Sequence, residues 1–154
     1  MRKNPKPERV LSRMTHLDLD DVIALERHCF PDPWPRDLIE VEIDEADDQR
    51  FPVVARVDGI LVGYMIAWFI ADEAHLGNLA VAPAAQRTGL ASALLEALVA
   101  EARLRGSAHI VLEVRAGNSG AIRLYERHGF DAVAVRKEYY EDDKEDAVIM
   151  MRLL

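Results

Sequence analysis

Cysteine is almost absent from the sequence, which has only Cys29 among its 154 residues. An internal disulfide is therefore excluded, and such a composition is typical of proteins that stay in the reducing cytoplasm. No apolar run approaches the roughly 20 residues that cross a bilayer, and the charged, proline-bearing start MRKNPKPERV does not resemble a secretion signal. We therefore expect a cytoplasmic location and no membrane partner.

Basic residues are in the minority, with 19 Lys and Arg against 27 Asp and Glu and a net charge of −8. Proteins that bind nucleic acids neutralise phosphates with a basic surface, so this balance predicts no nucleic-acid partner. The one cysteine and the five histidines are scattered, without the spacing of zinc ligands, so we expect no metal.

Apolar residues make up half of the chain, which is enough for a substantial core. We expect residues 8–154 to form a single domain and residues 1–7 to be a flexible tail. No repeat or low-complexity linker divides the sequence, and it says nothing about the oligomeric state.

Predicted strands and helices follow one another in the order β-α-α-β-β-β-α-β-α-β-β. Apolar and β-branched runs indicate strands at 9–15, 51–57, 60–70, 75–81, 109–116, 130–140 and 147–154. Helical spacing and capping residues predict helices at 16–30, 35–46, 90–105 and 118–129. The Asp58-Gly59 pair is typical of a two-residue hairpin turn. This order predicts an α+β fold with helices on both faces of a mixed sheet.

The turn QRTGLA at 86–91 separates an apolar strand from a helix whose apolar stripe includes Leu90, Leu94 and Leu98. Such a turn leaves several backbone N–H groups unpaired at a helix start, which makes an anion site. It matches neither a Walker loop nor a Rossmann fingerprint. Taken alone, the turn is equally compatible with an ordinary connection in which Gly89 relieves backbone strain.

Two longer stretches make the sequence recognisable. NLAVAPAAQRTGLASALL and LEVRAGNSGAIRLYERHGF, together with the order of elements, resemble the GCN5-related N-acetyltransferase (GNAT) superfamily from about Val10 onward. ERHCFPDPW, LEVRAGN and RKEYYEDDKEDAVIMM further resemble its RimI-like members, which acetylate the N-terminal alanine of the ribosomal protein S-eighteen. The resemblance implies the GNAT acyl-CoA N-acyltransferase fold, with a mixed central sheet flanked by helices.

The resemblance also implies acetyl-CoA as co-substrate and assigns residues to it. The backbone amides of the turn would hold the diphosphate, and they belong to Arg87, Thr88, Gly89, Leu90, Ala91 and Ser92. Ala91 departs from the glycine that many members have, but alanine is also small. The preceding strand would pair its backbone with the pantetheine arm and polarise the thioester carbonyl through Leu79, Ala80 and Val81.

Glu113 is the candidate general base. It interrupts the apolar strand IVLEV, where an unpaired carboxylate inside the protein would be costly. Strand alternation also allows a solvent-facing position for this residue. The corresponding glutamate of RimI-like enzymes is the base, and the resemblance therefore implies that role for Glu113.

Tyr125 is the candidate general acid, because a phenol can give a proton to the CoA thiolate. Asn118 lies seven residues earlier, nearly two helical turns, so both side chains are expected on one helix face. Packing in the core, beside Leu124 and Phe130, is the alternative for the tyrosine. The family pattern implies that the tyrosine lies near the thioester sulfur and the asparagine near the pantetheine.

Three other residues are weaker candidates. His75 is a second candidate base, ranked below Glu113, because it precedes the strand segment assigned to CoA. Cys29 could be a covalent nucleophile, although a cysteine beside Phe30 is more often a small buried apolar residue. Trp34 is expected either to shape the substrate mouth or to pack a loop.

Two acidic clusters bear on the acceptor, DEADD at 44–48 and EYYEDDKED at 138–146. In the family architecture the loop between the first two helices and the final hairpin flank the acceptor groove. The first cluster lies just after those helices, and the second occupies the hairpin itself. We hypothesise that the second cluster, with Tyr139 and Tyr140, receives a peptide whose first residues are basic. A solvated charged surface is the alternative.

The leading interpretation is an N-α-acetyltransferase acting on a protein or peptide N-terminus, such as that of a ribosomal protein. The same chemistry could serve a small amine or a lysine side chain. From a different class, the chain could be a non-catalytic acyl-CoA-binding domain, against which the presence of both Glu113 and Tyr125 argues.

Overall fold

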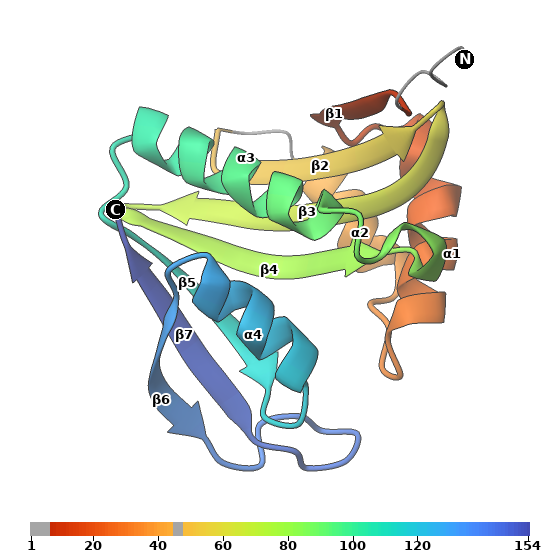
Figure 1. Ribbon diagram of the computed structural model, residues 1–154. Helices are drawn as coiled ribbons and strands as arrows, with labels where there is room; N and C mark the ends of the chain where they lie inside the picture. The colour runs from red at the N-terminus through yellow and green to blue at the C-terminus, as the bar shows by residue number, and fades with distance from the viewer. Residues whose placement is uncertain (1–6, 45–47) are drawn as a thin grey trace, which may run out of the picture.

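A computed structural model describes residues 7–44 and 48–154 of the chain. The elements follow the predicted order (Figure 1). The strands are β1 Arg9–Arg13, β2 Arg50–Val57, β3 Ile60–Ile70, β4 Glu73–Val81, β5 His109–Arg115, β6 Asp131–Arg136 and β7 Ala147–Leu153. The helices are α1 Leu19–Cys29, α2 Arg36–Asp44, α3 Leu90–Leu104 and α4 Ser119–Arg127, with short 3₁₀ turns at His16–Asp18 and Pro83–Ala85.

The seven strands form one mixed sheet in the order β1-β2-β3-β4-β5-β7-β6, in which only β4 and β5 pair in parallel. The β2–β3 hairpin turns at Asp58 and Gly59 with φ of 50° and 81°, as expected for a turn that needs two left-handed residues. Within the described ranges, no helix combines the length and the apolar character needed to span a membrane.

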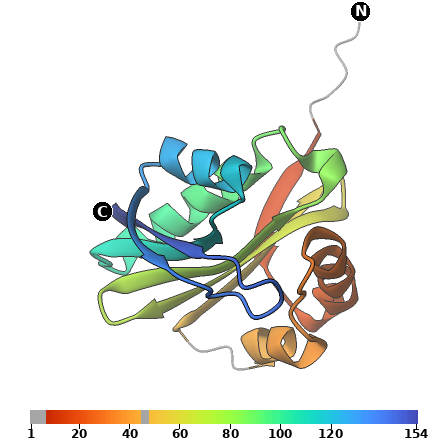
Figure 2. The ribbon, with the colours of Figure 1, turned by 90° about the horizontal axis from the view of Figure 1, so that it is seen from below.

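Helices cover both faces of the sheet, as predicted (Figure 2). One apolar core lies between the sheet and α3 and α4, and a second lies between the sheet and α1 and α2. The stripe on α3 faces the first core, where Leu94 and Leu98 are fully buried and Leu90 is 1% exposed. Burying these side chains on one face is what holds α3 against the strands.

Two predicted boundaries differ from the structure by three residues or more, the start of the first helix and the end of β6. The first helix begins at Leu19, after a 3₁₀ turn in which the Asp18 carboxylate accepts from the Thr15 N–H. The second helix ends at Asp44, and the predicted continuation to 46 lies outside the described residues, as do residues 1–6 of the predicted tail 1–7. Strand β6 ends at Arg136 instead of residue 140, because the chain turns there and Asp146 accepts from the Glu138 N–H.

The sheet splits between β4 and β5 (Figure 1). The two strands pair only from Glu73–Leu76 to His109–Leu112. Gly77 is the extra residue of a bulge, since Leu76 faces Ala67 on β3 and Asn78 faces the adjacent Ile66. Beyond the bulge, β4 continues to pair with β3 and β5 continues to pair with β7, so β4 and β5 no longer pair with each other.

Candidate active site

A cavity of about 520 Å³ lies at this split. Its wall combines α1 and the α1–α2 loop, the β4 bulge, the end of β5, the start of α4 and the β6–β7 loop. The predicted site residues that line it are Leu79, Glu113, Asn118 and Tyr125, together with Cys29, Trp34 and Tyr140. Segments that are far apart in the sequence therefore meet at the point where the sheet opens.

Glu113 and Tyr125 reach the cavity from opposite faces of the sheet. Leu112 and Val114 on β5 belong to the core under α3 and α4. Side chains alternate along a strand, so Glu113 points to the face of α1 and α2. Tyr125 comes from α4 on the other face. A base and an acid placed in this way can act on a bond that lies within the gap between them.

The Glu113 side chain is 24% exposed, so it lies neither in the apolar interior nor on an open surface. The Tyr139 hydroxyl donates to its Oε2 at 3.5 Å. The His75 Nε2 lies 3.7 Å from the same oxygen. The carboxylate therefore stands in the cavity wall with polar neighbours on its outer side.

The Tyr125 ring is 9% exposed and packs edge-on against Phe130, with ring centroids 5.9 Å apart. Burial raises the pKa of its hydroxyl to about 12. No side chain within residues 7–44 and 48–154 forms a hydrogen bond with that hydroxyl. At neutral pH the group is therefore a protonated donor directed at the cavity.

Asn118 caps α4, because its Oδ1 accepts from the Ala121 N–H at 3.2 Å. The same residue lines the cavity. The Asn start expected for this helix is therefore its cap, and the bond fixes the orientation of the Asn118 side chain at the cavity wall.

The edge of β4 offers backbone hydrogen-bonding groups to the split. Ala82 N donates to Val62 O at 2.7 Å, so by the alternation of an antiparallel ladder the N–H and C=O of Ala80 also face β3. Leu79 and Val81 direct theirs to the other side, where β5 has moved away and where the Val81 C=O accepts from Gln86 Nε2 at 3.3 Å. This open edge fits an extended chain that carries amide groups. Ala80 only separates Leu79 from Val81, because its own N–H and C=O face β3.

The turn before α3 carries the unpaired N–H groups expected of an anion site. Across the part of the chain that the structure describes, no backbone N–H of residues 87–92 has a hydrogen-bond partner. Arg87 and Gly89 have positive φ of 63° and 82°, which bends the chain around the start of the helix. The clustered donors and the helix dipole fit a diphosphate.

Three contacts hold this turn in place. Arg9 on β1 donates to Thr88 O at 2.8 Å, and the Thr88 hydroxyl donates to Ala85 O. The Ser92 hydroxyl pairs with His128 Nε2 at 2.9 Å, which ties α3 to the end of α4. Thr88 and Ser92 therefore have structural partners for their side chains, and their N–H groups are what they offer to an anion.

Glu26 is a residue of the cavity wall that the sequence reasoning missed. It is 1% exposed and accepts from Trp34 N at 2.9 Å, from Asn78 Nδ2 at 2.8 Å and from the Tyr64 hydroxyl. Burial raises the pKa of its carboxyl group. The available signal is its place four residues after Val22 on the apolar face of α1, where a carboxylate needs partners.

Trp34 lines the cavity on the side of α1 and α2. Its indole stacks on Trp68 with centroids 6.2 Å apart and an 8° angle between the rings. Trp68 donates from Nε1 to Glu42 at 2.9 Å, and the His75 ring lies edge-on at 5.5 Å. The α1–α2 loop is thereby held against the sheet, so Trp34 both packs the loop and lines the cavity.

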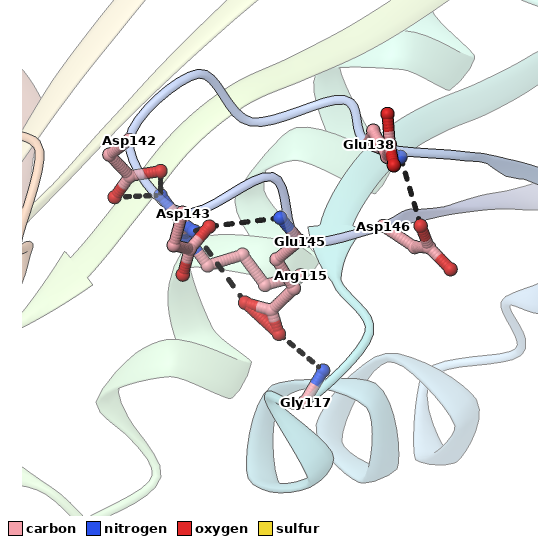
Figure 3. Close-up of polar contacts among 7 residues, drawn as sticks. All are labelled: Arg115, Gly117, Glu138, Asp142, Asp143, Glu145 and Asp146. Atoms are coloured by element: carbon pink, nitrogen blue, oxygen red, sulfur yellow. Dashed lines mark hydrogen bonds and ion pairs between the residues drawn. The ribbon is translucent and has the colours of Figure 1, made fainter.

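The acidic segment at 138–146 is engaged within the protein (Figure 3). Arg115 donates to Asp142 at 2.9 Å and to Asp143 at 3.0 Å, and it lies 3.5 Å from Glu145. Its guanidinium also lies 4.0 Å from the centre of the Tyr140 ring. These three carboxylates share the one cation that the β5 strand supplies, and Asp143 remains 55% exposed, so the segment keeps an excess of negative charge.

The first acidic cluster, at 44–48, is described only in part. Asp44 pairs with His16 at 2.5 Å, and residues 45–47 lie outside the described ranges. Cys29 is half-buried, with its Sγ 3.7 Å from Val81 O. Burial and then the nearby Glu26 charge raise the pKa of this thiol, so it is a poor nucleophile at neutral pH.

Fold and site together define an N-acetyltransferase: the chain belongs to the acetyltransferase (GNAT) family, whose model matches residues 19–130. Within the family it is similar to RimI-like enzymes. It is 47% identical over 142 residues, 91% of this chain and 94% of the relative, to the ribosomal protein bS18-alanine N-acetyltransferase of Escherichia coli K12. It is 34% identical to an N-alpha-acetyltransferase of Sulfurisphaera tokodaii, over 86% of each chain.

A solved structure of the Escherichia coli ribosomal-protein-S18-alanine N-acetyltransferase superposes with a TM-score of 0.86. The superposition covers 95% of this chain and 94% of that one, at 34% sequence identity. The predicted GNAT fold and the resemblance to RimI-like enzymes are thereby confirmed.

Proposed function

We propose that the protein transfers the acetyl group of acetyl-CoA to a free N-terminal α-amine in the cytoplasm, with the N-terminal alanine of ribosomal protein bS18 or a similar basic N-terminus as acceptor. The observation that carries the chemistry is the placement of Glu113 and Tyr125 on opposite sides of one cavity at the split. The acceptor class comes from the bS18-alanine N-acetyltransferases to which the chain is similar.

The unpaired N–H groups of 87–92 and the open β4 edge at Leu79 and Val81 support acetyl-CoA as the co-substrate. Bound there, acetyl-CoA supplies an acetyl group activated as a thioester. The N–H groups of the turn bind the diphosphate, and the β4 edge orients the pantetheine. An N–H group of that edge polarises the carbonyl. Asn118, which caps α4, lines the same groove.

The acceptor enters from the face of α1 and α2. Its amine must be neutral to attack, and an α-amine has a pKa near 7.7–8.0 against 10.4 for lysine. Neutralising a lysine at pH 7 costs about 3.5 kcal/mol more, so a single partly exposed carboxylate is better matched to an α-amine. Glu113 takes the proton, either directly or through a water molecule.

Tyr125 meets the sulfur side of the reaction. A hydroxyl whose pKa is raised to about 12 remains protonated, so it donates a hydrogen bond to the departing thiolate as charge develops there. The proton lost by the attacking nitrogen then completes the thiol. Burial of the ring keeps this donor aligned and keeps water away from it.

A matched pair of peptides tests the proposal. One begins with free Ala-Arg, and the other is blocked at its N-terminus and carries an internal lysine. Mass spectrometry locates the acetyl group after incubation with acetyl-CoA. Acetylation of the α-amine alone is expected. Acetylation of lysine, or of neither peptide despite CoA binding, would contradict the proposed acceptor.

Two variants test the roles of the side chains. Glu113→Gln and Tyr125→Phe should each lower kcat about 100-fold while leaving the KM for acetyl-CoA unchanged, because the first removes the base and the second removes the hydrogen-bond donor to the thiolate, with little change in volume. Glu96→Gln, on the exposed side of α3, is the control and should keep full activity. Full activity in both variants would show that neither side chain takes part in acetyl transfer.

A further inference from the structure

His75 stands directly behind the candidate base. It pairs with Val111 just before β4 and β5 separate, and Glu113 comes just after that point on β5. The His75 Nε2 is 3.7 Å from Glu113 Oε2, a gap that a small side-chain rotation or one water molecule closes. With 28% of its side chain exposed, the imidazole connects the carboxylate to solvent.

The proposed reaction needs such a connection because it releases one net proton. An α-ammonium ion and a thioester give an amide, a thiol and H⁺. When the N–C bond forms and the C–S bond breaks, the second nitrogen proton goes to the sulfur. The first proton stays on Glu113, and the carboxylate must lose it before the next turnover.

The neighbours of Glu113 differ in their ability to take that proton. Tyr139 donates to the carboxylate, and burial followed by the nearby Glu113 charge raises the pKa of its hydroxyl, so it already holds a proton. Trp68 has no basic atom, and Glu42 on α2 binds its Nε1 instead of the histidine. The ordinary pKa of an imidazole lies between those of a carboxyl group and an α-amine. An imidazole can therefore take a proton from a carboxyl group and release it to solvent.

We propose that His75 is a proton relay, which accepts the proton from Glu113 after each acetyl transfer and delivers it to solvent. This inference rests on the proposed function and adds a residue that touches the base rather than the substrates. Trp68, edge-on to the imidazole at 5.5 Å, holds the ring in the orientation that directs Nε2 toward Glu113.

The chain contains a matched control on the same two strands. His109 on β5 lies 3.0 Å from Glu73 on β4, and its side chain is 21% exposed, but this pair stands at the opposite end of the β4–β5 pairing from the split. His75→Gln and His109→Gln therefore remove equivalent imidazoles from equivalent His–Glu pairs. Only the first should affect proton release.

The test compares peptide acetylation by the wild type, His75→Gln and His109→Gln, with and without free imidazole in the buffer. His75→Gln should lower kcat about 100-fold with unchanged KM values, and imidazole should restore the rate. His109→Gln should match the wild type in both buffers. Rescue separates a relay from a structural role, because free imidazole cannot repair packing. His75→Asn serves if the glutamine variant does not fold.

A wild type that acetylates no α-amine would overturn the proposed function and the relay together. An active wild type matched by an equally active His75→Gln would overturn the relay alone. A loss of activity in His75→Gln that imidazole does not restore would also overturn it.

Discussion

Glu26→Leu tests how the cavity wall is built. Glu26 lies on α1, yet its carboxylate accepts from β3 through Tyr64, from β4 through Asn78 and from the α1–α2 loop through Trp34. Leucine keeps the volume and removes all three acceptor bonds. The variant therefore measures what these bonds contribute to stability.

The loss of the Glu26 carboxylate affects its three hydrogen-bond donors unequally. Asn78 Nδ2 has a second acceptor in the Tyr64 oxygen at 3.3 Å, and Trp34 N lies in a loop where water can replace the bond. The Tyr64 hydroxyl belongs to a fully buried ring and stays without an acceptor, at a cost of about 1–3 kcal/mol. Adding about 1 kcal/mol for each of the other two bonds predicts a loss of about 3–5 kcal/mol. The free energy of unfolding of a typical domain is only about 5–15 kcal/mol.

Urea unfolding followed by circular dichroism measures this loss. The control is Glu40→Leu on the exposed side of α2, where Glu40 pairs only with Arg36 and a change within about 0.5 kcal/mol is expected. A free energy of unfolding for Glu26→Leu within about 1 kcal/mol of the wild type would refute the reasoning, because the buried donors would then not need Glu26.

The pH dependence of stability follows from the same residue. Burial raises the pKa of Glu26 in the folded state, so between its unfolded value near 4.3 and this raised value the folded state binds the additional proton. Its contribution to stability is present below about pH 4.3 and is lost as the pH rises through the folded pKa. Glu26→Gln cannot titrate and should lack this decline. Parallel pH profiles of the two proteins would contradict the assignment.

Two further predictions concern the acceptor side. Gly77→Ala would place a Cβ inside the Trp68 ring, so it should cost about 1–3 kcal/mol of stability and raise the acceptor KM, whereas Gly120→Ala, in open space on α4, should not destabilise. Arg115→Met leaves the acidic loop without its shared cation and removes the contact with Tyr140; it should raise the acceptor KM and leave the KM for acetyl-CoA unchanged, as steady-state kinetics with each substrate varied would show.

Local patterns were sufficient for the elements whose contacts are local. The stripe on α3 and the Asp58-Gly59 turn were predicted correctly, because helical spacing and left-handed turn residues act within a few positions of the chain. The predicted end of β6 was wrong because the true end is set by Asp146. Its carboxylate accepts from the Glu138 N–H only after the loop has closed. Apolar residues extending toward 140 gave no sign of that bond.

The site shows the same division. The turn at 86–92 and the strand before it could be predicted, because their chemistry lies in consecutive backbone groups. Glu26 was missed because its partners Tyr64 and Asn78 are 38 and 52 residues away. The contact of the acidic loop with Arg115 was missed because the guanidinium lies 27 residues before the Asp142 carboxylate that it binds.

The sequence by itself determined the order of elements, the apolar face of each helix, the turn with unpaired N–H groups before α3 and the candidate pair Glu113 and Tyr125. Only the tertiary structure decided that β4 and β5 part after Leu76 and Leu112, so that Glu113 and Tyr125 meet across a gap from opposite faces. The physical reason is that strand pairing joins residues remote in the chain. The bulge at Gly77 that redirects β4 is favoured by the fit of Trp68 over a residue without a side chain.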